Sequence, residues 1–185
     1  MSNAVKGFTL IELMMTLSIA AILMTIAIPS YITFTKNSRI TSQANDLITS
    51  IHIARGEAAR RGVKTALCRS GDATAANPTC GGSNYDYSNG WLVFSIADNR
   101  GGTPVYDTTK GDELLALGKP QNGVTVYSGG GANVNLEFNP DGSLNENGSD
   151  AEFAVCDERG ASHGKSITIL ATGRPSLSDA TDCTP

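Results

Sequence analysis

An unbroken apolar run from Phe8 to Ile32 constrains this chain more than any other feature. It exceeds the roughly 20 residues that carry a helix across about 30 Å of hydrocarbon. A cleaved secretory signal is the alternative, but its apolar stretch usually has about 7–15 residues and ends at a small-x-small site. Here Ala20 and Ala21 lie inside the run and no polar break follows them. We therefore expect a membrane-spanning helix.

Four cysteines indicate on which side of the membrane the rest of the chain lies. Basic residues flank the apolar run on both sides, so charge alone does not fix its orientation. The cysteines all follow the run, and none has metal-ligand spacing with His52 or His163. Two disulfides in an oxidising compartment are the preferred interpretation, and four reduced thiols are the alternative. The pairs Cys68–Cys80 and Cys156–Cys183 are favoured because each closes the shorter loop.

The apolar run contains one charge, Glu12, and this carboxylate needs an explanation. An ionised side chain at the centre of a bilayer costs roughly 2.5–3.5 kcal/mol and usually marks function. Glu12 lies about 6 Å along a helix from Phe8, so an acid at the membrane interface is one interpretation. The other pairs it with a cation at similar depth. No basic side chain in the run can supply one, but a free amino group at Phe8 could, if the chain were cut after Gly7.

The stretch "KGFTLIEL" resembles the class III signal of type IV pilins and type II secretion pseudopilins. The resemblance implies that a prepilin peptidase cuts after Gly7 and methylates the new amino terminus at Phe8. It also implies that Pro29 kinks the helix and that Glu12 meets the Phe8 ammonium of a neighbouring subunit. A buried charge without a partner is heavily penalised, so this pair would set the register of the filament.

Apolar residues continue beyond the run at helical spacing. Steps of three and four residues predict an amphipathic helix that ends near Arg61 and Gly62. Its apolar stripe consists of Ile40, Ala44, Leu47, Ile51, Ala54 and Ala58. The expected organisation is a leader (1–7), a membrane and filament-core half of the helix (8–32), an amphipathic half (33–62) and a β domain (63–185).

Short β-rich segments separated by turn sequences fill the rest of the chain. These segments are residues 63–68, 90–96, 124–128, 134–138, 152–156 and 166–171. Alternation in the first of them places Val63, Thr65 and Leu67 on one face. Closely spaced strands without helices between them favour antiparallel pairing. The fold class is therefore α+β, with one long N-terminal helix packed on an antiparallel β domain.

Three further stretches, "GWLVFSIADNRGG", "FNPDGSL" and "ITILATGRPS", resemble the GspH/FimT family of minor pilins and pseudopilins. Gly173 and Arg174 fall on the family's C-terminal motif, and Arg174 is expected to bind local carbonyls or acids. The resemblance implies a minor type IV pilin near the pilus tip that primes assembly, with roles in twitching motility or adhesion. A minor pseudopilin of a type II secretion system is the alternative.

The same resemblance implies where the chain works and with what. The location would be the inner membrane, with the β domain in the periplasm and later on the pilus surface. The partners would be other minor and major pilins, contacted through the helix, and membrane lipid before assembly. The prepilin peptidase and the inner-membrane assembly platform would act on the chain.

Other function classes find little support in the sequence. It has no nucleophile, zinc or phosphate-binding motif, so we expect no enzyme, no cofactor and no metal. An oxygen-rich stretch could hold calcium but lacks the spacing of an EF-hand loop; its residues are Asp141, Ser143, Asn145, Asn147 and Asp150. A DNA receptor is the alternative of another class. Residues 70–185 carry more acidic than basic side chains, so nucleic acid is an unlikely partner.

Overall fold

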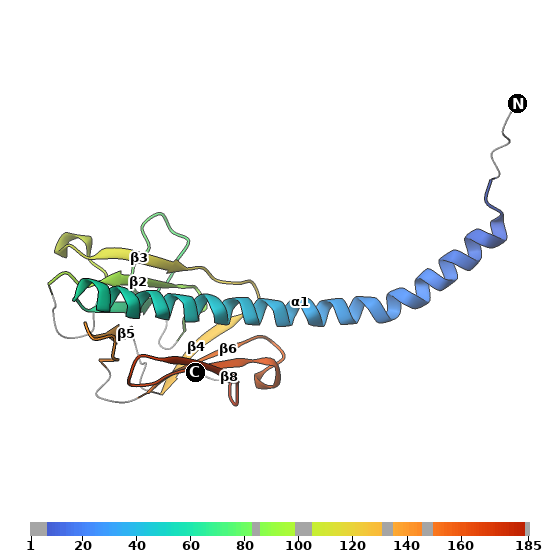
Figure 1. Ribbon diagram of the computed structural model, residues 1–185. Helices are drawn as coiled ribbons and strands as arrows, with labels where there is room; N and C mark the ends of the chain where they lie inside the picture. Colours follow the sequence, from blue (N-terminus) through green and yellow to red (C-terminus); the bar gives the residue numbers. More distant parts are fainter. Residues whose placement is uncertain (1–6, 83–85, 99–104, 131–134, 146–149, 184–185) are drawn as a thin grey trace, which may run out of the picture. The chain divides into compact units, whose positions relative to one another are not determined.

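The computed structural model describes residues 7–82, 86–98, 105–130, 135–145 and 150–183. The chain divides into two compact units, Met1–Ser38 and Arg39–Pro185. One helix, α1 (Leu10–Arg61), belongs to both, and only its part after Ser38 has β-strands beside it in the same unit. A long helix followed by strands (Figure 1) is the predicted α+β class.

The second unit contains two antiparallel sheets. The first sheet has the strand order β3-β2-β1-β5, and the second sheet has the order β4-β6-β7-β8. Every pairing between these strands is antiparallel. The strands are β1 (Thr65–Arg69), β2 (Trp91–Ser95), β3 (Glu113–Gly118), β4 (Thr125–Gly130), β5 (Asn135–Phe138), β6 (Ala151–Cys156), β7 (Lys165–Ile169) and β8 (Pro175–Asp179).

Two short 3-10 helices lie in the connections of this unit. The first, η1 (Thr108–Lys110), precedes β3, and the second, η2 (Ala161–His163), precedes β7. Neither contributes a buried residue to the core.

One core joins α1 to the inner faces of both sheets. All six residues of the predicted apolar stripe are at most 1% exposed, which confirms the helical periodicity. Leu67 and Val93 of the first sheet and Phe153 and Ile167 of the second belong to the same cluster. This shared core fixes α1 against the strands of its own unit.

Trp91 anchors the helix to the first sheet. Its indole Nε1 donates a 2.9 Å hydrogen bond to Ser50 Oγ, and that hydroxyl donates a 2.9 Å bond to the Asp46 carbonyl. A Cβ at Gly118 would lie 2.0 Å from the Trp91 ring, so only glycine fits there. The large side chain is thus fully buried with its polar atom satisfied.

The first sheet is buried on both faces. All five residues of β1 are buried, and its side chains alternate between the two faces as predicted, with Leu67 in the helix-facing core and Ala66 and Cys68 on the other face. The second face forms a separate core of Ala66, Cys68, Leu92, Phe94 and Ile96. The segments between the strands of this sheet, residues 70–90 and 96–112, supply the half-buried Cys80 and Tyr106 that pack on this core.

Six of the expected strand segments overlap the strands that the structure shows, and β3 and β8 were missed. The sequence of β3, "ELLALG", consists mainly of good helix formers and does not alternate. The sequence of β8, "PSLSD", is polar and largely exposed. Both strands lie at an edge of a sheet and have one neighbour each. Pairing with that neighbour therefore determines their conformation.

Candidate functional site

Thr9 and Glu12 form a reciprocal cap at the start of α1. The backbone N–H and the hydroxyl of Thr9 each donate a 2.9 Å hydrogen bond to Glu12 Oε2. In return, Thr9 Oγ1 accepts a 3.3 Å hydrogen bond from the Glu12 amide. This is a capping box, which satisfies amide groups that the first turn of a helix leaves without partners. The sequence signal for it is T-x-x-E before an apolar run, and our reading of the sequence missed it.

Gly7 and Phe8 lie just before the helix, where a processing enzyme could reach the backbone. Both residues are exposed and outside regular secondary structure, and Phe8 is 87% exposed. A Cβ added at Gly7 would have no heavy atom within 4 Å. The structure places the expected cleavage position outside regular secondary structure, in open chain beside the Thr9–Glu12 cap.

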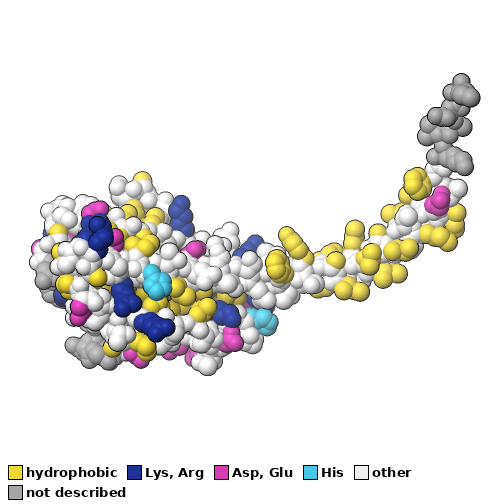
Figure 2. Space-filling view, in the orientation of Figure 1, with side chains coloured by type: hydrophobic (Ala, Val, Ile, Leu, Met, Phe, Trp, Pro, Cys, Tyr) yellow, Lys and Arg dark blue, Asp and Glu magenta, His cyan; other side chains and the backbone are white. Residues whose placement is uncertain are grey.

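The first unit presents an apolar surface (Figure 2). The large apolar side chains from Phe8 to Phe34 are between 48% and 87% exposed. By length and composition, α1 can cross a membrane, and it is the one such helix among the described residues. Bare apolar surface of this extent needs lipid or another protein to cover it.

Five hydroxyl groups of the first unit are satisfied by the helix itself. Each donates to a backbone carbonyl three or four residues earlier, with donor–acceptor distances from 2.6 to 3.1 Å. The donors are Thr16, Ser18, Thr25, Thr33 and Thr35. These five donors therefore need no partner from an apolar environment, where an unmet donor would be costly.

Pro29 lies inside α1 and does not melt it. Proline has no N–H to donate to the carbonyl four residues earlier, so a bend or local melting was expected. The helix is continuous from Leu10 to Arg61, and Figure 1 draws its apolar half as curved but unbroken. The hydroxyl of Thr33 donates a 3.1 Å bond to the Pro29 carbonyl one turn later.

Both disulfides have the pairing that the loop lengths favoured. Cys68 is bonded to Cys80, and Cys156 is bonded to Cys183. The first joins β1 to the segment that covers the outer face of the first sheet. The second joins the end of β6 to the chain after β8, so each disulfide fastens a peripheral segment to a sheet.

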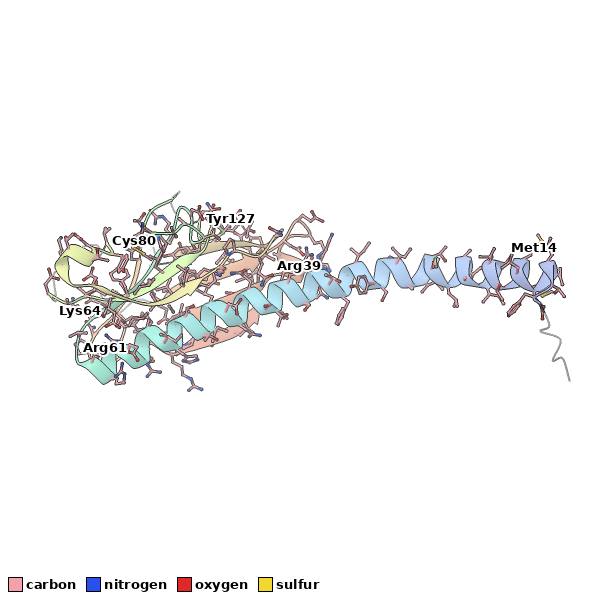
Figure 3. All side chains as sticks on the ribbon, turned by 90° about the horizontal axis from the view of Figure 1, so that it is seen from above. Met14, Arg39, Arg61, Lys64, Cys80 and Tyr127 are labelled. Atoms are coloured by element: carbon pink, nitrogen blue, oxygen red, sulfur yellow. A yellow bond between two sulfur atoms is a disulfide. The ribbon has the colours of Figure 1, made fainter. Side chains whose placement is uncertain are left out.

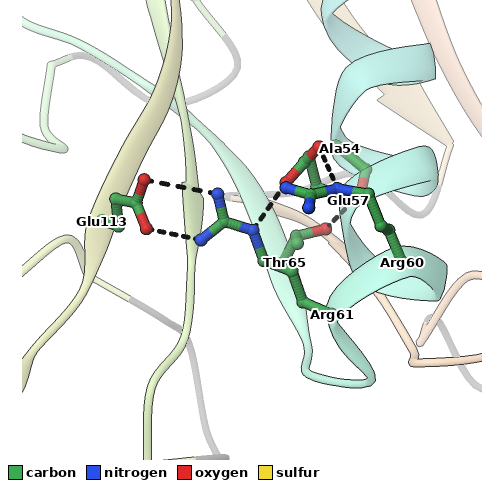
Figure 4. A network of polar contacts seen from close by, with 6 residues as sticks. All are labelled: Ala54, Glu57, Arg60, Arg61, Thr65 and Glu113. Carbon is green, nitrogen blue, oxygen red and sulfur yellow. Dashed lines mark hydrogen bonds and ion pairs between the residues drawn. The ribbon is translucent and has the colours of Figure 1, made fainter.

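Charged residues connect the end of α1 to β3 (Figure 4). Arg60 Nη2 and Arg61 Nε donate to Glu57 Oε2 at 2.6 and 2.5 Å, and Arg61 Nη1 donates to Glu113 Oε2 at 2.5 Å. The hydroxyl of Thr65 donates a 2.8 Å bond to the Ala54 carbonyl. These contacts fix the turn from the helix into β1.

The same contacts shift the pKa values of both acids. Hydrogen bonds from Arg60 and then Arg61 lower the pKa of Glu57 from 4.5 to about 2. The hydrogen bond from Arg61 also lowers the pKa of Glu113.

The helix ends at Arg61 as predicted. Gly62 follows with φ of 67° and donates its N–H to the Ala58 carbonyl at 3.0 Å.

Gly173 and Arg174 form the turn between β7 and β8, and the glycine is the structural residue of the pair. Gly173 has φ of 78°, and a Cβ there would lie 2.1 Å from the Gly142 carbonyl oxygen. Arg55 Nε donates a 3.3 Å bond to the same carbonyl. Arg55 therefore bonds α1 to the turn at Gly142, against which Gly173 packs.

Arg174 does not have the expected structural role. Its side chain is exposed and makes no hydrogen bond or ion pair to the part of the chain that the structure describes. Only its backbone carbonyl participates in the turn, where it accepts a 3.1 Å bond from the Leu170 N–H. The expected contacts of Arg174 with local carbonyls or acids are thus not found in the described chain, and the arginine that binds a carbonyl near this turn is Arg55 from α1.

The oxygen-rich stretch near residue 141 is occupied by turn contacts. Asp141 Oδ1 accepts from the amide and hydroxyl of Ser143, and Asn145 Nδ2 donates to Glu137. Asp150 Oδ1 accepts from the Ala171 amide, and Asn147 lies outside the described residues. No group of three or more His, Cys, Asp or Glu suited to a metal ion occurs in the described ranges.

Comparisons with known proteins agree with this architecture. Residues 43–173 match the family described as type II transport protein GspH, and residues 2–28 match the prokaryotic N-terminal methylation motif. No curated protein matches the chain.

Two crystal structures of the type IV minor pilin FimU from Pseudomonas aeruginosa are similar to the chain. The first, in space group P65, has a TM-score of 0.55 and 19% identity over 78% of this chain and 99% of FimU. The second, in space group P21, has a TM-score of 0.56 and 20% identity over 82% of this chain and 99% of FimU. At this identity the likeness shows the fold. Because the family match spans most of the chain and the methylation motif precedes it, the chain belongs to the GspH family, the GspH/FimT-like minor pilins and pseudopilins.

Proposed function

We propose that the chain is a minor type IV pilin that is incorporated at or near the pilus tip and helps to prime filament assembly. The apolar surface of the first unit carries this proposal, because it must pass from lipid to other helices for a filament to form. We place the protein in the inner membrane before assembly, with the second unit in the periplasm. Other minor and major pilins, the prepilin peptidase and the assembly platform are its proposed partners.

Glu12 has a double role in this proposal. Before assembly its carboxylate is held by Thr9 of the same helix, at 2.9 Å from both the amide and the hydroxyl. After cleavage at Gly7, the Phe8 ammonium of a neighbouring subunit becomes a second partner. Burying an ammonium and a carboxylate as a pair in a water-free helix bundle costs much less free energy than burying either charge alone. The pair then selects one axial register for each added subunit.

A minor pseudopilin of a type II secretion system is the second candidate. The family description, type II transport protein GspH, favours it. The two candidates share the helix, the cap and the β domain, so the same assembly physics applies to both. Deletion of the gene separates them, because loss of surface pili with intact secretion supports the pilin, and the reverse supports the pseudopilin.

Substitution of Glu12 tests the assembly role. Glu12→Ala and Glu12→Gln should be cleaved and methylated at Phe8, as shown by the N-terminal mass, because the peptide bond after Gly7 is unchanged. Their amount in sheared filaments should fall more than tenfold, since an unpaired buried ammonium costs about 3–5 kcal/mol. Asp46→Asn is the matched control, an exposed acid on the same helix outside the apolar segment. Unchanged incorporation of the Glu12 variants would reject the register role.

A further inference from the structure

A pocket of about 440 Å³ lies on the outer side of the first sheet. One wall is the disulfide-closed segment Ala76–Thr79, and the other consists of Tyr106, Asp107, Thr108 and Leu114. The neighbouring Tyr106 and Cys80 pack on the outer core of that sheet, and α1 packs on the inner core. Figure 3 accordingly places Cys80 on the far side of the strands from α1.

The walls of the pocket are rigidly held. Cys80 is bonded to Cys68 of β1, and its Sγ accepts a 3.4 Å hydrogen bond from the Tyr106 amide. The Ser70 hydroxyl donates to the Thr79 carbonyl at 3.1 Å. The buried carboxylate of Asp112 accepts from the Asp107 amide at 2.9 Å. A disulfide and three hydrogen bonds thus hold the two surface segments that line the pocket.

The lining of the pocket combines apolar and polar groups. Pro78, Leu114 and the ring of Tyr106 supply apolar surface, and that ring rests against Phe94 with 5.5 Å between centroids. The lining also carries four side-chain groups that make no hydrogen bond to the described part of the chain. They are the Asn77 amide and the hydroxyls of Thr79, Tyr106 and Thr108.

We propose that this pocket binds a neutral carbohydrate. The apolar C–H faces of a sugar ring can pack on the aromatic and aliphatic side chains of the lining. The hydroxyls around its edge can hydrogen-bond to the amide and hydroxyl groups of the lining. The charged residue in the lining is Asp107, so an anionic ligand would be repelled. A purely apolar ligand would leave the four polar groups dry and unpaired. The volume is within the range of small-ligand sites.

The position of the pocket fits a surface role. If α1 faces the filament axis, the connections that cover the outer face of the first sheet, and the pocket that they line, remain open to solvent. This accessibility argument rests on the function proposed above, but binding by the purified protein does not depend on it. Long connections such as residues 70–90 and 96–112 frequently carry binding sites on a rigid scaffold.

The test uses the full chain in detergent, an array of neutral and acidic glycans, and amide NMR shifts with the best neutral sugar. Saturable binding with shifts of the amides of residues 76, 77, 79, 106–108 and 114 is expected, since Pro78 has no amide proton. Tyr106→Phe should weaken it about fivefold, the effect of one neutral hydrogen bond, and Asn77→Ala with Tyr106→Phe should abolish it. Tyr127→Phe is the matched control, a half-buried tyrosine on β4 of the other sheet.

Several outcomes would overturn the proposal. These are no binding to any neutral glycan, preference for acidic glycans, or unchanged affinity of the double variant with an unchanged melting temperature. Filament incorporation of Tyr106→Phe is measured in parallel. Normal incorporation with lost sugar binding separates this site from assembly, whereas failed assembly of the parent chain with intact sugar binding would reject only the pilin role.

Discussion

Thr9 and Glu12 hold each other at the first turn of α1, the hydroxyl and amide of one donating to a single carboxylate oxygen of the other. In the isolated subunit, the Glu12 carboxylate therefore already has hydrogen-bond donors. Its local contacts reduce the cost of carrying a charge in an apolar segment.

Thr9→Val should fray the first turn of α1 while leaving the volume of the side chain unchanged. Loss of an N-cap hydroxyl costs about 1 kcal/mol, which corresponds to about fivefold faster exchange of the first-turn amides. Hydrogen exchange of the full chain in detergent measures this. Thr9→Ser keeps the hydroxyl and should exchange like the parent, whereas equal protection in Thr9→Val would contradict the cap.

Stability should fall in acid through the charge cluster at the end of α1. The pKa of Glu57 is about 2 in the folded chain and its ordinary value is 4.5. A lowered folded-state pKa stabilises the fold above pH 4.5, and this contribution is lost as pH falls from about 4.5 to about 2. Urea midpoints across this range should therefore decline.

Arg61→Gln identifies the source of that decline. The substitution removes the partner that Glu57 and Glu113 share, so the pH-dependent part of the stability should shrink. Lys110→Gln is the matched control, because Lys110 is an exposed cation at the end of η1. Equal pH dependence in the parent and Arg61→Gln would show that other acids cause the decline.

Gly173→Ala should destabilise the second unit more than Gly123→Ala. Both glycines have positive φ, 78° and 76°, so both variants strain the backbone by about 1–2 kcal/mol. A Cβ at Gly173 also meets the Gly142 oxygen at 2.1 Å, whereas one at Gly123 meets nothing within 4 Å. Urea unfolding should show the extra loss in Gly173→Ala. Equal losses would mean that the two turns do not pack closely.

Arg174→Ala should change the free energy of unfolding by less than about 0.5 kcal/mol. An exposed side chain without a partner in the described chain contributes little to stability. Arg55→Ala should cost more, because Arg55 bonds the Gly142 carbonyl. A larger loss in Arg174→Ala than in Arg55→Ala, measured by urea unfolding, would restore the structural role to Arg174.

Loss of either disulfide should lower the melting temperature. Each closes a short loop, with separations of 12 and 27 residues, and loops of this size are worth about 3 kcal/mol. In a unit of this size that is a decrease of about 10 °C. Circular dichroism of the Cys68→Ser/Cys80→Ser and Cys156→Ser/Cys183→Ser variants measures it.

The two disulfide variants should differ in a second measurement. Only the first disulfide fastens the segment that covers Leu92, Phe94 and Ile96. Proteinase K, which does not require Lys or Arg, should therefore cleave the Cys68→Ser/Cys80→Ser variant within residues 70–90 sooner than the other variant. Identical cleavage patterns would contradict the covering role.

The long helix and its buried stripe could be predicted because one physical period governs them. Apolar residues at steps of three and four share one face only in an α-helix. A glycine after two arginines marks the C-terminal end of this helix. Edge strands are harder to predict. Nothing in "ELLALG" or "PSLSD" alone favours a strand, since one reads as helix and the other as loop. Their conformation comes from hydrogen bonds to β2 and β7, which are distant in sequence or separated by a turn.

In the candidate site too, local contacts can be predicted from the sequence and long-range contacts cannot. The T-x-x-E cap is local, so it could have been predicted from the residues, although it was missed. The role of Arg55 was not, because its partner Gly142 lies 87 residues away and only the fold brings them together. Likewise, the sequence around Asn77 and Tyr106 does not predict that the two residues line one pocket. The pocket forms only when their two connections fold over the sheet.

The two separate cores have a consequence for how such subunits can diversify. The helix-facing layer and the outward layer meet only through the backbone of one sheet, so substitutions in the outward connections do not alter the packing that α1 needs. A lineage can therefore change the surface that these connections display while keeping the packing of α1 on the two sheets.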